Sequence, residues 1–211
     1  MPAGVEQIGE NIYRRSGSIG SNVYFLDFSR KAIIDTGHPS ETKEIIQDFR
    51  RFGLDIESCE YILNTHSHGD HVGGNAFFRR KYTDSRILGT PKTIEITALA
   101  EEISLYEGLL DAYDSYDIDF FISDGDRIDL GEIELTVHET PGHADDSLSF
   151  YIPTRKILFS GDVCYRNIVA HLDLLNNPYE SLSKLKRTYK NLLKMDIVAM
   201  APGHGAVIMN P

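Results

Sequence analysis

Short apolar runs bounded by turn-forming residues recur along the whole chain. Runs of roughly four to eight residues, rich in β-branched and aromatic side chains and flanked by Gly, Pro or Asn, are typical of strands. The predicted strands cover residues 11–15, 22–28, 32–34, 61–64, 128–130, 133–137, 147–152, 156–160 and 197–201.

Longer segments carry apolar residues three and four positions apart, which is the spacing of one helix face. The longest of them has Leu99, Ile103, Tyr106, Leu110 and Tyr113 in this register. Helices are predicted from about Glu41 to Phe52 with Ser40 as N-cap, from His71 or Val72 to Tyr82, from Pro91 to Tyr116, and from Tyr179 to Met195. The pattern therefore predicts a mixed α/β protein.

The length and composition fit one domain spanning residues 1–211. The chain has 211 residues, of which 41% are hydrophobic, so it can bury a sizeable core. No apolar run reaches the roughly 18 residues that cross a membrane, and the first residues lack the basic and apolar regions of a signal peptide. Two cysteines, Cys59 and Cys164, make no disulfide framework. We expect a cytoplasmic protein without a membrane partner, and a homo-oligomer stays open.

The net charge of −11 argues against a nucleic-acid partner. Binding to a phosphate backbone needs clusters of Lys and Arg. The one modest cluster, Lys184 to Arg187, falls on a predicted helix, where a solvated face is the ordinary interpretation. We expect a small molecule as the partner.

The segment from Thr65 to His71 holds the densest group of chemically active side chains. Imidazole and carboxylate are the ligands that Zn²⁺ and related divalent ions prefer, and one ion takes about four of them. Donors this close along a backbone converge poorly on a single ion. They predict two adjacent ions with further ligands from elsewhere; the donors are His66, His68, Asp70 and His71.

Further donors follow three other predicted strands. Each comes directly after a Pro-Gly or Gly turn, and such residues punctuate strand ends. Sites at strand ends on a rigid sheet are where α/β architectures usually place chemistry. The three donors are His143, Asp162 and His204.

With these motifs the sequence resembles the metallo-β-lactamase superfamily of metal-dependent hydrolases, from about Ile12 to His204. The resemblance implies a four-layer αβ/βα sandwich with a helical insert near residues 91–118. It also implies one metal site of His66, His68 and His143, a second of Asp70, His71 and His204, and Asp162 as the bridge between them. The first motif is not the His-x-Glu-x-Asp version of flavodiiron relatives, which disfavours oxygen-reducing chemistry.

Two divalent ions, zinc first and iron or manganese as alternatives, would generate a bridging hydroxide at neutral pH and polarise a carbonyl. Asp70 could orient the hydroxide and accept a proton as the leaving group departs. By resemblance, Asp35 lies beneath the metals, where a carboxylate can accept the second N–H of a ligating histidine. The tripeptide Asp35-Thr36-Gly37 has no second copy, so aspartic-protease chemistry is disfavoured.

The predicted substrate is a small acyl ester, thioester or lactone. Lactonases of the superfamily carry a tyrosine three residues after the bridging aspartate, and Tyr165 has that spacing here. Hydroxyacylglutathione hydrolysis of the glyoxalase II type is the alternative, followed by a phosphodiesterase or nuclease and by a non-catalytic metal-binding module. Anionic substrates are disfavoured by the acidic residues between Ile94 and Ile122, namely Glu95, Glu101, Glu102, Glu107, Asp111, Asp114, Asp117 and Asp119.

Four other residues near these motifs receive no metal role. Three histidines lie outside the motif positions and are interpreted as non-ligands: His38, His138 and His171. Cys164 lies two residues after Asp162 and is interpreted as a packing residue, because free cysteine is commonly buried.

Overall fold

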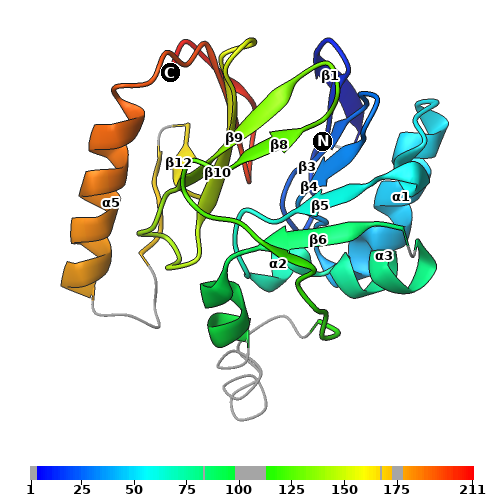
Figure 1. Ribbon diagram of the computed structural model, residues 1–211, viewed down its shortest axis with the longest axis horizontal. Coiled ribbons are helices and arrows are strands. Elements are labelled where there is room, and N and C mark those ends of the chain that lie inside the picture. Colours follow the sequence, from blue (N-terminus) through cyan, green and yellow to red (C-terminus); the bar gives the residue numbers. More distant parts are fainter. Residues whose placement is uncertain (1–3, 83, 98–112, 167, 173–177) are drawn as a thin grey trace.

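The computed structural model describes residues 4–82, 84–97, 113–166, 168–172 and 178–211. Two β-sheets face each other, and helices cover their outer faces (Figure 1). The predicted α/β sandwich is therefore confirmed. Among the described residues, no helix combines the length and apolarity that crossing a bilayer requires.

The first sheet contains seven strands in sequence order. The first four are antiparallel, whereas β4 to β7 run parallel. The carboxyl ends of β4, β5 and β6 therefore lie at one edge of the sheet. The strands are β1 (Val5–Gly9), β2 (Ile12–Arg15), β3 (Val23–Leu26), β4 (Ala32–Ile34), β5 (Tyr61–Leu63), β6 (Arg86–Gly89) and β7 (Phe120–Phe121).

The second sheet has six strands in the order β15-β14-β11-β10-β9-β8. All its pairs are antiparallel except β11 with β14. Its strands are β8 (Arg127–Asp129), β9 (Glu134–Glu139), β10 (Leu148–Ile152), β11 (Ile157–Gly161), β14 (Ala199–Pro202) and β15 (Ile208–Met209). A separate hairpin pairs β12 (Cys164–Tyr165) with β13 (Ile168–Val169).

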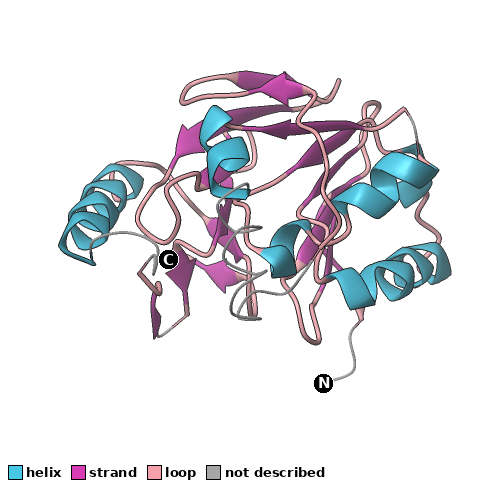
Figure 2. Cartoon of the chain, turned by 90° about the horizontal axis from the view of Figure 1, so that it is seen from below, coloured by secondary structure: helices cyan, strands magenta, loops and turns pink. Residues whose placement is uncertain are grey.

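Three hydrophobic clusters fill the three interfaces between the four layers. The central cluster joins the sheets, with Leu63 from one facing Phe150 and Phe159 from the other. A second cluster packs α1 (Thr42–Arg51) and α3 (Asn75–Lys81) against the outside of the first sheet. The third packs α5 (Pro178–Leu192) against the outside of the second sheet (Figure 2). Burial of apolar surface on both faces of each sheet thus stabilises the sandwich.

The helix predicted from residue 71 to 82 is divided in the structure. A short α2 (Gly69–Val72) is followed by two glycines and then by α3. A Cβ atom at Gly73 would lie 2.2 Å from Cδ of Pro39, and one at Gly74 would lie 2.8 Å from the carbonyl oxygen of Thr36. The two glycines let the chain after β4 approach the helices closely.

The predicted insert helix is correct at residues 91–97 and wrong at 113–116, where the chain is not helical. Residues 98–112, with most of the predicted apolar stripe and half of the acidic side chains named above, lie outside the described residues. Tyr116 and Ile118 pack against the second cluster, and the hydroxyl of Tyr113 donates to the carbonyl of Ser67. Tertiary contacts override helical periodicity there.

The cap predicted for α1 is also wrong. Ser40 lies inside a 3-10 turn, η1 (Pro39–Glu41), that precedes α1, and a second 3-10 turn, η2 (Ile56–Ser58), follows α1. The cap of η1 is His38, whose ring Nδ1 accepts from the backbone N–H of Ser40 at 3.2 Å. His38 is therefore a capping residue of the turn after β4.

Candidate metal centre

Seven His and Asp side chains converge at the edge where strands of both sheets end. The histidine motif follows β5, and the other three donors follow β9, β11 and β14. Their possible ligand atoms form three groups, each with all atoms within 4.8 Å of one another. The structure thus brings together His66, His68, Asp70, His71, His143, Asp162 and His204.

One group consists of His66, His68 and His143. The Nδ1 atom of His68 lies 3.0 Å from Nε2 of His66 and 3.1 Å from Nε2 of His143. Three ring nitrogens this close, from segments distant in sequence, are arranged as ligands of one ion.

The other two groups both contain His71, and the Asp162 carboxylate lies near the histidines of both. The Oδ2 atom of Asp70 lies 3.1 Å from Nε2 of His204 and 3.8 Å from Nε2 of His71. Asp162 presents Oδ1 to Nε2 of His71 at 3.3 Å, while its Oδ2 lies 3.5 Å from Nε2 of His204 and 3.6 Å from Nε2 of His143. The Asp162 carboxylate therefore lies between the two sets of histidines.

Two buried atoms in this cluster fit a metal ion. The Nε2 atom of His71 and the Oδ1 atom of Asp162 are both buried, and their mutual contact at 3.3 Å lacks the geometry of a good hydrogen bond. Unsatisfied buried polar groups are rare in folded proteins because desolvation costs free energy. A divalent cation would satisfy both atoms, and the donor set matches the ligands of zinc and related metals.

Asp35 holds the cluster from below, as expected. Its Oδ2 accepts from Nδ1 of His71 at 2.8 Å and from the Thr65 hydroxyl at 2.8 Å, and its Oδ1 accepts from the Thr65 backbone N–H. Because Nδ1 of His71 donates to Asp35, Nε2 is the nitrogen that faces the cluster and that would bind a cation once its proton has left. Asp35 thus fixes one histidine and the start of the motif.

Two further positions support the cluster and carry no sequence signal of their own. Nδ1 of His143 donates to the backbone carbonyl of His171 at 2.9 Å, so His171 acts through its main chain. Gly203 lies against the centre, because a Cβ there would be 2.1 Å from Oδ1 of Asp162 and 2.6 Å from Cε1 of His71. Only glycine leaves room for that carboxylate oxygen.

Tyr165 lies beside the cluster. Its ring centroid is 6.3 Å from that of His204, and its hydroxyl is hydrogen-bonded to Asp162. Burial, the charge of Asp162 and this hydrogen bond raise the pKa of Tyr165, so the hydroxyl keeps its proton. The neighbouring Cys164 packs in the third cluster, as expected, and burial raises the pKa of its thiol to about 11.

The histidines differ in their readiness to bind a cation. Burial followed by the charge of neighbouring histidines lowers the pKa of His66 well below its usual range and that of His68 to about 4. Burial alone would also lower the pKa of His71, but Asp162 and Asp35 raise it well above its usual value. At neutral pH, His66 and His68 are neutral, whereas His71 binds a proton that an entering cation must displace.

We therefore expect metal binding at His71 to release protons at pH 7. Because its folded pKa is raised, affinity there should increase as the pH rises towards that pKa. Calorimetric Zn²⁺ titration in buffers of different ionisation enthalpy should give about one proton for this step and near none for binding at His66, His68 and His143. Asp35→Asn, which removes a charge that raises the His71 pKa, should reduce the release. Equal release in both steps would contradict the prediction.

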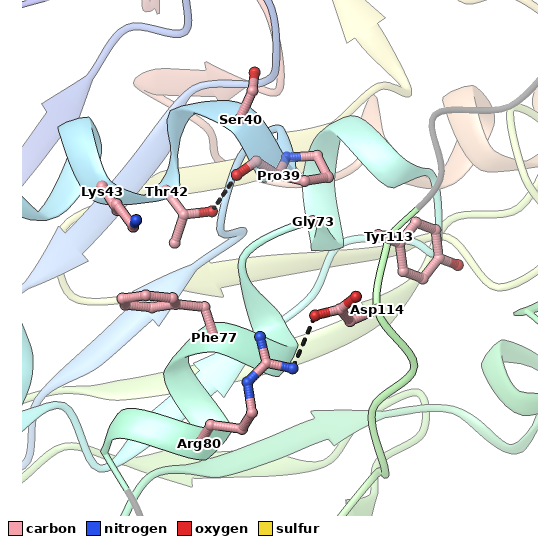
Figure 3. Close-up of a pocket in the computed structure, with 9 residues that line it drawn as sticks. All are labelled: Pro39, Ser40, Thr42, Lys43, Gly73, Phe77, Arg80, Tyr113 and Asp114. Carbon is pink, nitrogen blue, oxygen red and sulfur yellow. Dashed lines mark hydrogen bonds and ion pairs between the residues drawn. The ribbon is translucent and has the colours of Figure 1, made fainter.

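A pocket of about 350 Å³ adjoins the segment that carries the histidine motif (Figure 3). Gly73, at the end of α2, lines it together with Lys43, Phe77 and Arg80. Arg80 pairs with Asp114 at 2.8 Å, and Arg79 pairs with Asp119. Two carboxylates of the acidic segment are thus neutralised by arginines of α3, so their negative field is weaker than the sequence suggests.

Comparison with known proteins agrees with this geometry. A model of the metallo-β-lactamase superfamily matches residues 17–204. The chain belongs to the metallo-β-lactamase superfamily, whose members are metal-dependent hydrolases.

Curated relatives are similar over much of the chain. Beta-lactamase-like protein 2 homolog of Caenorhabditis elegans is 27% identical over 190 residues, which cover 90% of this chain and 57% of that protein. Hydroxyacylglutathione hydrolase GloC of Haemophilus influenzae is 28% identical over 189 residues, which cover 85% of this chain and 82% of the enzyme. Two further hydroxyacylglutathione hydrolases are matched over 53% of their length, so the chain spans about half of some relatives.

Solved structures share the fold. A motif mutant of the metallo-β-lactamase from Cronobacter sakazakii aligns with a TM-score of 0.80 at 21% identity, over 97% of this chain and 81% of that one. The subclass B3 metallo-β-lactamase of Bradyrhizobium japonicum aligns with a TM-score of 0.77 at 23% identity, over 96% of this chain and 78% of that one. At these identities the similarity concerns the architecture.

Proposed function

We propose that this protein hydrolyses a small acyl ester, thioester or lactone at a centre of two divalent metal ions, most simply zinc. His66, His68 and His143 would hold one ion, and Asp70, His71 and His204 the other. The observation that carries the proposal is the position of Asp162, whose two carboxylate oxygens face different histidines at 3.3–3.6 Å. A carboxylate so placed can bridge two ions.

Divalent ions at this centre supply a hydroxide nucleophile at neutral pH and polarise the acyl carbonyl. Asp70 would orient the attacking water and pass its proton to the leaving group. Burial alone would raise the pKa of Asp70, but the hydrogen bond with His204 and the charge of His71 lower it to about 2. Asp70 is therefore a carboxylate at neutral pH, the form that binds a metal ion and accepts a hydrogen bond from water.

Tyr165 would donate a hydrogen bond to the developing oxyanion of the substrate, in exchange for the hydrogen bond that its hydroxyl makes with Asp162. Its raised pKa keeps the hydroxyl protonated, which a donor requires, and the hydrogen bond to Asp162 places the hydroxyl at the centre. A hydrogen-bond donor near the position where the negative charge develops can stabilise the transition state.

We expect Tyr165→Phe to lower kcat by roughly tenfold or more with unchanged metal content, since one oxyanion donor can contribute ~2.7–4 kcal/mol. Steady-state kinetics together with metal analysis would measure both quantities. Tyr151→Phe is the matched control, because the Tyr151 hydroxyl donates to the Asp196 carbonyl, away from the cluster. Unchanged kinetics in Tyr165→Phe would assign this residue to packing.

Hydrolysis of a hydroxyacylglutathione thioester is the second candidate function. Several relatives carry that name. The pocket beside the motif offers Lys43 to an anionic substrate, while Arg80 in the same pocket is paired with Asp114. The remaining negative charge of the chain favours neutral acyl substrates over this one.

The test is metal quantification combined with a substrate panel. Metal-loaded protein should contain about two ions per chain and cleave neutral thioesters, esters or lactones more efficiently than lactoylglutathione, with β-lactams last. A preference for lactoylglutathione would favour the second candidate. Specific cleavage of RNA or a phosphodiester, or no hydrolysis of any substrate, would overturn the proposal.

A further inference from the structure

Arg15 and Glu41 form a buried ion pair outside the metal cluster, and the Glu41 carboxylate also contacts a loop that lies near the cluster. Arg15 is fully buried and Glu41 is 3% exposed. One guanidinium nitrogen of Arg15, Nη1, donates to Oε1 of Glu41 at 2.8 Å, and its Nε donates to Asp48 at 3.2 Å. A third carboxylate, that of the exposed Glu44, lies 3.7 Å from Nη2 of Arg15, and of these acidic partners Glu41 is the one that also contacts the loop.

The Glu41 carboxylate accepts from three consecutive backbone N–H groups. Ser18 and Gly20 donate at 3.0 and 2.7 Å, and Ile19 donates at 3.2 Å. Burial alone would raise the pKa of Glu41, but the hydrogen bonds from Arg15 and from these N–H groups lower it to about 2. The carboxylate is therefore charged at neutral pH and holds the loop of residues 18–20 in one conformation.

The residues that follow this loop connect two parts of the metal cluster. The backbone N–H of Ser21 donates to the carbonyl of Asp70 at 3.0 Å. The backbone N–H of Asn22 donates to the carbonyl of Gly203 at 2.6 Å, and its side-chain amide donates to the carbonyls of Pro202 and Gly205 at 2.9 and 2.8 Å. Residues 21 and 22 therefore join the turn that presents Asp70 to the turn that presents His204.

Glycine at position 20 lets this connection lie close to the cluster. A Cβ atom there would be 2.4 Å from the backbone nitrogen of His38 and 2.9 Å from the carbonyl oxygen of Asp70. The loop thus has backbone contact with Asp70 on one side and is held by Glu41 on the other. A shift of the loop would move Asp70 relative to His204.

We propose that Glu41 is a positioning residue for the Asp70–His71–His204 half of the metal centre, acting through residues 18–22. The inference rests on the two-ion centre proposed above. The other half is supported differently: Nδ1 of His143 donates to the His171 carbonyl, and Nδ1 of His66 lies 3.1 Å from the Thr65 hydroxyl. Loss of Glu41 therefore weakens one ion and spares the other.

Glu41→Gln and Glu41→Asp test this inference. The first removes the charge at constant shape, and the second keeps the charge but withdraws the carboxylate by one methylene. Asp48→Asn is the matched control, because it removes the charge of another hydrogen-bonded partner of Arg15 without touching the loop. Stepwise Co²⁺ and Zn²⁺ affinities, measured by absorption and chelator competition, provide a readout independent of hydrolysis; kcat and KM are measured on the metal-loaded proteins.

Both Glu41 variants should bind the ion of the Asp70–His71–His204 half at least tenfold less tightly and keep the affinity for the other ion within threefold. Their kcat should fall by a larger factor than their KM changes. Asp48→Asn should keep both affinities within threefold. Wild-type affinities in both Glu41 variants, or equal losses at the two sites, would overturn the inference. A wild-type protein that binds only one ion would overturn the two-ion proposal and the inference together, whereas a two-ion wild type with unaffected variants overturns the inference alone.

Discussion

Asp162→Ala should lose at least one metal ion and lower kcat/KM by more than roughly a hundredfold. Replacement of a residue that merely orients a ligand already costs about 10–100-fold in metal affinity or activity. Asp162 lies between the two sets of histidines and is 6% exposed, so water cannot readily replace its carboxylate.

Metal analysis and kinetics at saturating Zn²⁺ would measure both effects. Asp196→Ala is a suitable control, since Asp196 is an exposed carboxylate paired with Lys156 away from the cluster. A variant that retains two ions, or one ion with full activity, would show that Asp162 is not the bridge.

Gly203→Ala should have an effect of similar size although it removes no ligand. The added methyl group would lie 2.1 Å from Oδ1 of Asp162 and 2.6 Å from Cε1 of His71. The His71 ring cannot move away easily, because it is fully buried and donates to Asp35. The Asp162 oxygen must therefore turn out of position, and we expect metal affinity and kcat/KM to fall by roughly a hundredfold or more.

Gly205→Ala is the control that distinguishes the steric contact of Gly203→Ala with Asp162 from the effect of backbone strain. Gly205 has a φ of +83°, which disfavours alanine, but a Cβ there meets nothing within 4 Å. The Gly205→Ala variant should have a free energy of unfolding about 1 kcal/mol lower than that of the wild type and an unchanged metal content. Stability of the chelated protein, followed by thermal unfolding, would show whether Gly203→Ala folds. A folded Gly203→Ala variant with wild-type metal content would refute the steric argument.

The metal donors are predictable from sequence because their signals are local. The histidine motif follows a recognisable apolar strand, and Pro-Gly or Gly turns mark the other three donors. The architecture follows from the resemblance that these motifs carry, whereas periodicity alone predicts only the mixture of helices and strands. The structure confirms the sandwich and brings the predicted donors together.

Supporting contacts were not predictable in the same way. The carbonyl of His171 and the N–H groups that bind Glu41 belong to the main chain, so no residue type identifies them. The break at Gly73 and the non-helical segment at Tyr113 depend on contacts with residues distant in sequence, including Pro39 and Ser67. Helical periodicity contains no information about such partners.

The donors come from both sheets of the sandwich, and this origin has a consequence for the lifetime of the protein. An ion held by His66 and His143, or by Asp70 and His204, would fasten the two halves of the chain to each other. A metal ion that binds the folded chain and not the unfolded chain stabilises the folded state. It therefore reduces the opening that exposes the chain to proteases. Metal supply would then control the cellular abundance of this protein as well as its chemistry, and starvation for the ion would clear the protein without any change in its synthesis.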